Sequence, residues 1–158
     1  LFLRLHLMSE NILDKAKAAA QSLTEKVTNF SEGFGESDKA EIINLFKGIS
    51  GDRVAEMFAN VDKFKSLFYE AGYEVGGINV SLGLPPDISI SFKFLGSVDD
   101  VKRNEIELKV AENKLASIIL NSLFKASDFT EKVKLGEMKL NSINIKLGLI
   151  PSISISLT

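Results

Sequence analysis

A nearly repeated segment constrains this chain more than any other feature of its sequence. The segment INVSLGLPPDISISFKF begins at Ile78, and INIKLGLIPSISISLT begins 65 residues later, at Ile143. When 78–92 is aligned with 143–157, ten of the 15 residues are identical. The same offset carries the apolar stripe of a predicted helix before the first segment onto apolar residues before the second. Such a repeat indicates an internal duplication of one supersecondary unit.

Alternation within each copy predicts a β-hairpin. Apolar side chains occupy every second position, as they do in strands with one buried face. Directly opposed residues of an antiparallel pair share a face, so we expect Leu82 opposite Ile90 across a three-residue loop, 85–87. The predicted strands cover residues 78–84, 88–94, 143–149 and 153–157.

A break in the alternation precedes each hairpin. Tyr73 is out of phase with the apolar residues that follow, and the phase changes at Gly76 and Gly77. The second copy changes phase at Asn141 and Ser142. One extra residue in a strand has this effect, so we expect a β-bulge at both places.

Helical periodicity precedes the hairpins, at 9–30, 38–48, 52–70 and again around 119–133. The segment 105–110 alternates strictly and favours a strand, although a long helix running through Leu123 also fits it. We therefore expect an α+β fold, in which two tandem helix and β-hairpin repeats form an antiparallel sheet covered by helices on one face. The expected parts of one compact domain are 1–36 with an extra N-terminal amphipathic helix, 37–100 with the first repeat and 101–158 with the second.

Composition excludes several classes of function. The chain has no cysteine and a single histidine, His6, which excludes disulfides, thiolate metal sites and histidine clusters. A net charge of -2 without a basic stripe predicts no binding to nucleic acid. No segment approaches the roughly 18 apolar residues of a transmembrane helix. Because no export signal is recognisable, the cytoplasm is the expected compartment.

Two local clusters are weak candidates for chemistry. GFGESDK, from Gly33, lacks the Gly-Lys-Ser/Thr ending of a phosphate-binding loop, and a flexible linker explains it better. Asp99, Asp100, Glu105 and Glu107 lack the spacing of a calcium loop, and a solvated loop explains them better. We predict no catalytic, metal-ligating or cofactor-binding residue.

The other face of the predicted hairpins is small, polar and nearly uncharged. Its candidate interaction residues are Asn79, Ser81, Ser89, Ser91, Asn144, Lys146, Ser154 and Ser156. Serine has only a middling strand propensity, so its alternation with isoleucine in both copies favours a flat face that a partner approaches closely. A face that simply meets water is the alternative.

Three functions remain. We expect first a non-catalytic binding or assembly module that acts through β-hairpin edges or the Ser-rich face, with a second copy or another protein as its partner. The strand at 153–157 has no charge and no proline, so its edge needs a neighbour, for which the first hairpin and 105–110 are the candidates. A carrier of an apolar ligand such as a lipid, held between sheet and helices, is second. An enzyme using carboxylates, serine or lysine is third, with no positive support.

Overall fold

The computed structural model describes residues 26–29, 34–83, 85–133 and 136–158. Its elements are β1 (Lys26–Asn29), α2 (Glu36–Phe46), α3 (Gly51–Asp62), α4 (Lys65–Glu70), β2 (Tyr73–Ser81), β3 (Asp87–Phe94), α5 (Asp100–Val110), α6 (Lys114–Val133), β4 (Leu140–Leu147) and β5 (Ser152–Leu157). Helices and antiparallel strands therefore follow one another in blocks, as in α+β proteins.

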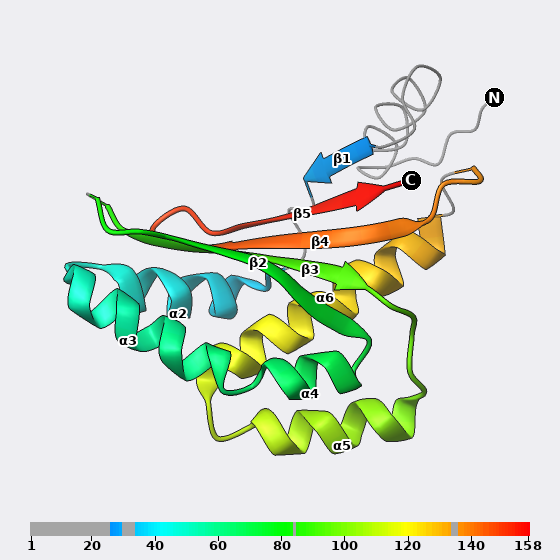
Figure 1. The fold of residues 1–158 in the computed structure, drawn as a ribbon, viewed down its shortest axis with the longest axis horizontal. Coiled ribbons are helices and arrows are strands. Elements are labelled where there is room, and N and C mark those ends of the chain that lie inside the picture. The colour runs from blue at the N-terminus through cyan, green and yellow to red at the C-terminus, as the bar shows by residue number, and fades with distance from the viewer. Residues whose placement is uncertain (1–25, 30–33, 84, 134–135) are drawn as a thin grey trace.

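The strands form one antiparallel sheet in the order β1-β5-β4-β3-β2. Figure 1 shows the sheet as the upper layer, with α2 to α6 beneath it on one face. The expected mixture of helices with an antiparallel sheet is confirmed. The opposite face of the sheet has no helix on it among the described residues.

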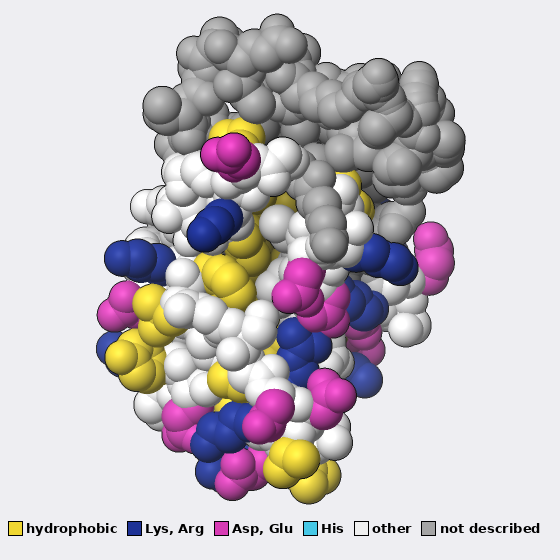
Figure 2. Space-filling view, turned by 90° about the vertical axis from the view of Figure 1, so that its right-hand side faces the viewer, with side chains coloured by type: hydrophobic (Ala, Val, Ile, Leu, Met, Phe, Trp, Pro, Cys, Tyr) yellow, Lys and Arg dark blue, Asp and Glu magenta, His cyan; other side chains and the backbone are white. Residues whose placement is uncertain are grey.

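The helical layer carries charges of both signs on its solvent side. Lys102 lies 3.4 Å from carboxylate oxygens of both Glu70 and Glu105, which raise the pKa of its ammonium group. Figure 2 shows Lys, Arg, Asp and Glu side chains interspersed over the part of the surface formed by helices. Exposed pairs of this kind contribute little to stability, so packing beneath the helices must hold the layers together.

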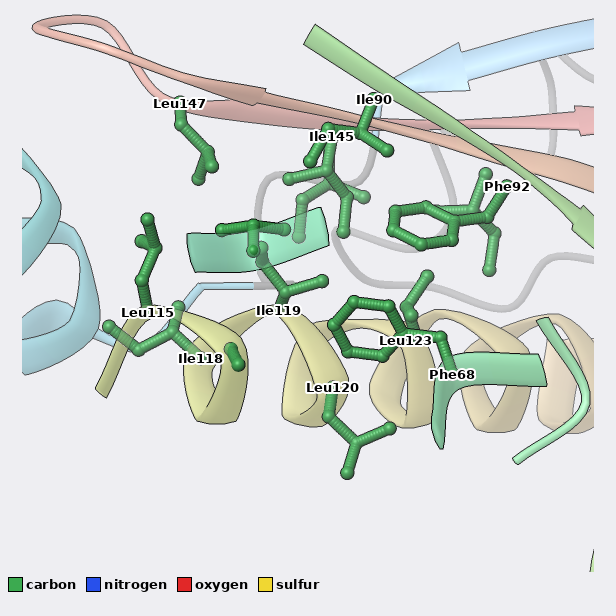
Figure 3. Packing of buried hydrophobic residues seen from close by; sticks show 14 of the residues in the cluster. Phe68, Ile90, Phe92, Leu115, Ile118, Ile119, Leu120, Leu123, Ile145 and Leu147 are labelled. Atoms are coloured by element: carbon green, nitrogen blue, oxygen red, sulfur yellow. The ribbon is translucent and has the colours of Figure 1, made fainter. Parts of the chain in front are cut away.

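The core lies between the sheet and α6. Ile90, Ile145 and Ile153 are directly opposed across three strands, and all of them are buried. From α6, Ile119 and Leu123 come from successive turns of one helix face and are fully buried. Figure 3 shows side chains of α6 meeting those of β3 and β4 in this layer. The prediction that alternate apolar residues of the hairpins share the core face is confirmed for these strands.

The register of each hairpin differs from the predicted one by four residues. Ile90 lies opposite Ile78 rather than Leu82, and the second hairpin is displaced in the same way. The last pairs of the two hairpins are Ser81 with Asp87 and Lys146 with Ser152. Five residues therefore lie between the paired strands in each hairpin, 82–86 and 147–151, instead of three. Leu82 lies in the first loop, outside the ladder, and is 62% exposed.

Contacts before the bulge explain the longer loops. The observed register places Tyr73 opposite Phe94, with their ring centroids 5.8 Å apart, and Val75 opposite Phe92. The predicted register would have ended β3 opposite Ile78 and left Tyr73 without a strand partner. Lengthening a loop from three to five residues costs only about 0.5 kcal/mol, so the aromatic pairing determines the register.

Both predicted bulges are present. The ladder shifts between Val75 and Gly77 in β2, and between Leu140 and Ser142 in β4. Gly76 and Asn141 are therefore the extra residues. Each bulge shifts the phase of the alternation by one residue, so that apolar residues both before and after the break face the helices.

Residues 105–110 are helical, so the strand predicted there is wrong. They belong to α5, where the Asp99 side chain caps the first turn by accepting a hydrogen bond from a backbone N–H at 2.8 Å. Ile106 and Val110 are buried, whereas Leu108 is 79% exposed. Residues spaced by four lie on one face of a helix and also on one face of a strand. The burial of Ile106 and Val110 is therefore compatible with either structure.

Residues 26–29 form the strand β1, so the helix predicted over 9–30 does not include them. The rest of that predicted helix lies outside the described residues. All of β1 pairs antiparallel with β5, which therefore lies between β1 and β4. The edge of β5 is thus covered by β1, and neither of its two expected neighbours pairs with it. Val27 and Thr28 suit a strand because β-branched residues favour extended backbone.

The helix predicted over 52–70 is divided into α3 and α4. The chain turns at Lys63 and Phe64, where the Phe64 N–H donates to the Val61 carbonyl at 2.9 Å. After this turn Phe68 is fully buried and meets the edge of the Phe92 ring, with centroids 5.5 Å apart. The division therefore places an aromatic side chain of α4 against β3.

Candidate functional site

The candidate site is the sheet face turned away from the helices, which we call the polar sheet face. Two rows of directly opposed residues cross it. The first row is Asn79, Ser89, Lys146 and Ser152, and the second is Gly77, Ser91, Asn144 and Ser154. Because opposed residues share a face and successive residues alternate, both rows point away from the apolar core.

The structure places all eight sequence-predicted residues on the polar sheet face. Six of them belong to the two rows, and Ser81 and Ser156 extend the face by the same alternation. Asn79, Ser81 and Asn144 are exposed, while Ser156, opposite β1, is only 8% exposed. The other four are half-buried. The face is therefore most open along β2 and most enclosed beside β1.

Charges lie only at the margins of the two rows, apart from Lys146 within the first. Lys93 is opposite Glu74 at one end of the β2–β3 hairpin, and Asp87 is opposite Ser81 at the other. Lys139, whose backbone exchanges two hydrogen bonds with that of Thr158 next to the last β4–β5 pair, extends the face by the same alternation and makes three cations against two anions. The described polar sheet face therefore carries few charges, mostly at its margins, whereas the helical layer carries many charges of both signs.

The chemistry available on this face is hydrogen bonding. Ser89 Oγ donates to Asn144 Oδ1 at 3.4 Å, from β3 to β4. Hydroxyl and amide groups can both donate and accept, and a serine hydroxyl rotates to suit its partner. Among the described residues, no three acidic, histidine or cysteine side chains gather as a metal site. The described side chains of this face can therefore donate hydrogen bonds to a partner and accept them from it.

A buried polar cluster that the sequence did not reveal lies on the helical side. The Tyr73 hydroxyl is 2.6 Å from Ser127 Oγ and donates to the Leu123 carbonyl at 3.2 Å. Beside it, the Arg103 guanidinium donates to both carboxylate oxygens of Asp128, at 2.8 and 2.9 Å. In the sequence, the one signal that could have indicated this cluster was Ser127, a serine on the apolar face of α6. Because Tyr73 is only 1% exposed, the cluster joins β2 to α5 and α6 rather than forming an open site.

Because of this cluster, the free energy of unfolding declines at alkaline pH. Burial raises the pKa of Tyr73 from 10.0 to about 12, although the Ser127 hydrogen bond and Arg103 oppose the increase. A raised phenol pKa stabilises the fold fully below the unfolded value of about 10, and this contribution is lost as pH rises through about 12. The expected loss is of the order of 2–3 kcal/mol.

We therefore expect Tyr73→Phe to flatten the decline in unfolding free energy above pH of about 10, measured by urea denaturation. Near neutral pH the variant should lose only about 1 kcal/mol, the value of a typical hydrogen bond. The control is Tyr69→Phe, since Tyr69 is the other tyrosine and is 56% exposed. An unchanged alkaline decline in Tyr73→Phe would contradict the assignment.

Comparisons of this chain with known proteins found no relative. No protein-family model, no curated protein and no solved structure matches the chain. In the part of the chain that the structure describes, no helix is both long and apolar enough to span a bilayer. The function proposed for this protein therefore rests on its polar sheet face.

Proposed function

We propose that this protein is a non-catalytic binding or assembly module that acts through its polar sheet face. The observation that carries the proposal is the two rows of serine, asparagine and glycine across β2 to β5, on the face that no described helix covers. The partner we favour is a second copy of the chain or another protein that offers hydrogen-bonding groups.

The distribution of charge supports this role. The centres of protein interfaces are depleted of charged residues, and serine, glycine and asparagine provide adaptable hydrogen bonds in the binding loops of antibodies, although serine is depleted in other protein interfaces. Solvent-facing helices of this protein carry ion pairs such as Arg53 with Glu56 and Lys65 with Asp62. The second row of the polar sheet face, from Gly77 to Ser154, has no charged member. Small side chains there would let a partner approach the backbone closely.

Strand edges support the proposal less than the face does. The outer edge of β5 is paired with β1 along four residues, so it is not open there. Among the described residues, no strand pairs with the outer edge of β2, but the bulge at Gly76 interrupts its regular row of backbone groups. Bulges discourage pairing between strand edges. We therefore favour contact through the face.

We also propose that the chain contains two related units, residues 37–100 and 101–158, after an N-terminal segment, 1–36. Moving α2 by 65 residues gives 101–111, one residue away from the bounds of α5. The same offset moves the ladder shift between Val75 and Gly77 to the shift between Leu140 and Ser142. A matching bulge supports a duplication more strongly than matching lengths of helix, because bulges are specific features.

The test adds two lysines to the uncharged row. Ser91→Lys with Ser154→Lys places a cation on each side of Asn144, so two such faces would repel each other. The control, Asn60→Lys with Ser66→Lys, adds the same charge at exposed positions of α3 and α4. Sedimentation velocity should show concentration-dependent association of the wild type and the control, weakened about tenfold or more in the face variant.

Two outcomes would contradict a role of the polar sheet face in self-association. A wild type that stays monomeric up to near-millimolar concentration would exclude self-association. A face variant that associates as strongly as the wild type would exclude the polar sheet face as the contact. Far-ultraviolet circular dichroism and thermal unfolding of each variant would establish that it is folded.

A further inference from the structure

A second surface lies where the two hairpin loops meet. Residues 82–86 read LGLPP and residues 147–151 read LGLIP, so neither loop has a charged side chain. Leu82 is 62% exposed, Ile150 is 76% exposed and Leu149 is 37% exposed. Single exposed aliphatic residues are common, but a contiguous group of them marks an interaction site.

The two loops are in contact. A Cβ placed on Gly148 would lie 3.5 Å from the Pro86 carbonyl oxygen and 2.9 Å from Asp87 Cβ, so the second loop touches the end of the first. A Cβ placed on Gly51 would lie 3.5 Å from the Leu82 side chain, which brings the start of α3 to the same place. Figure 1 shows both loops at the same end of the sheet, on the left. We call Leu82, Leu149 and Ile150 the apolar end.

We propose that the apolar end inserts into the interfacial region of a lipid bilayer. Both loops lie at one end of the molecule, so both can meet a planar surface together. A bilayer is fluid and closes around aliphatic side chains of irregular arrangement, which removes them from water. This surface is separate from the polar sheet face, so the proposal does not depend on the function proposed above.

The size of the apolar end favours a bilayer over a second copy. A stable protein interface buries roughly 800 Å² on each partner and involves about 20–30 residues a side. Among the described residues, the apolar end offers only three exposed large aliphatic side chains. Insertion into lipid needs no matching surface of that area, because lipid chains supply the contacts.

Charge beside the loops indicates which lipids would suit. Asp87 follows the first loop and Lys146 precedes the second. At the start of α3, Asp52 is adjacent to Arg53. Lys47, in the connection that leads to α3, adds one further cation, so the excess is a single positive charge and the attraction for anionic headgroups is weak. We therefore expect binding to neutral phosphatidylcholine vesicles, with little dependence on salt.

The first test compares two pairs of substitutions by co-sedimentation with phosphatidylcholine vesicles. Leu82→Ser with Ile150→Ser should weaken vesicle binding by about tenfold or more. The control is Val101→Ser with Leu108→Ser, since these two residues of α5 are each 79% exposed. The control should bind as the wild type does, because it removes aliphatic groups that are at least as exposed, but from elsewhere.

A tryptophan reporter gives an independent readout, because the chain has none of its own. Fluorescence of Ile150→Trp should shift to shorter wavelength when vesicles are added, and that of Leu108→Trp should not. Absence of vesicle binding by the wild type would overturn the proposal. An equal loss in both serine pairs, or binding that requires phosphatidylserine and disappears in salt, would also overturn it. Self-association that Leu82→Ser with Ile150→Ser abolishes, without vesicle binding, would assign the apolar end to a second copy instead.

Discussion

Gly72→Ala is expected to lower the free energy of unfolding by about 3–5 kcal/mol. Gly72 follows α4 with φ 103, and its carbonyl accepts a hydrogen bond from the Leu95 N–H at 2.8 Å. A Cβ at this position would overlap the Gly96 carbonyl oxygen. The overlap is with backbone, which cannot rotate away, so either the α4–β2 turn or the segment after β3 must move.

Substitutions of two further glycines distinguish the effect of steric overlap from the effect of backbone strain. Gly48→Ala combines a positive φ of 67 with open space around the added Cβ, so about 1–2 kcal/mol is expected. Gly77→Ala has neither problem and should change stability by less than about 1 kcal/mol. Urea denaturation of the three variants should therefore rank Gly72→Ala well below the others. Equal losses for Gly72→Ala and Gly48→Ala would show that the overlap is relieved at no cost.

Ile106→Ala should destabilise the protein by about 2–5 kcal/mol, whereas Leu108→Ala should change its stability by no more than about 0.5 kcal/mol. Ile106 is fully buried and Leu108 is 79% exposed, because a helix turns residues two apart to different sides. In a strand the two side chains would share a face and the two substitutions would have similar effects. Chemical denaturation compares them directly, and similar losses would contradict the helical assignment of α5.

Because β5 lies inside the sheet, a proline substitution in it is not a selective test of assembly. A strand with an open edge would let Ser154→Pro block pairing with a second molecule selectively. Ser154 instead lies opposite Asn144 of β4 and Asn29 of β1, inside the sheet. Proline there would remove a backbone donor and distort a paired strand, so unfolding would obscure any effect on assembly. Lysine on the polar sheet face tests assembly without removing a backbone donor.

Sequence alternation determined which residues face the core and which form the polar sheet face. Ile88, Ile90 and Phe92 are buried as their parity requires, and Ser89 and Ser91 lie on the other face. The bulges were also predictable, because one extra residue reverses the phase of the pattern on either side of it. These features are local, since they depend on residues one or two positions apart.

Only the tertiary structure decided the register, the nature of α5 and the neighbour of β5. Side chains in a strand repeat every two residues, so displacing a hairpin by four leaves the pattern unchanged, and the contact of Tyr73 with Phe94 determines the choice. The spacing of Ile106 and Val110 fits both the helical and the strand period, and only packing against the core selects the helix. β1 pairs with a strand more than a hundred residues away, and local periodicity carries no information about such a partner.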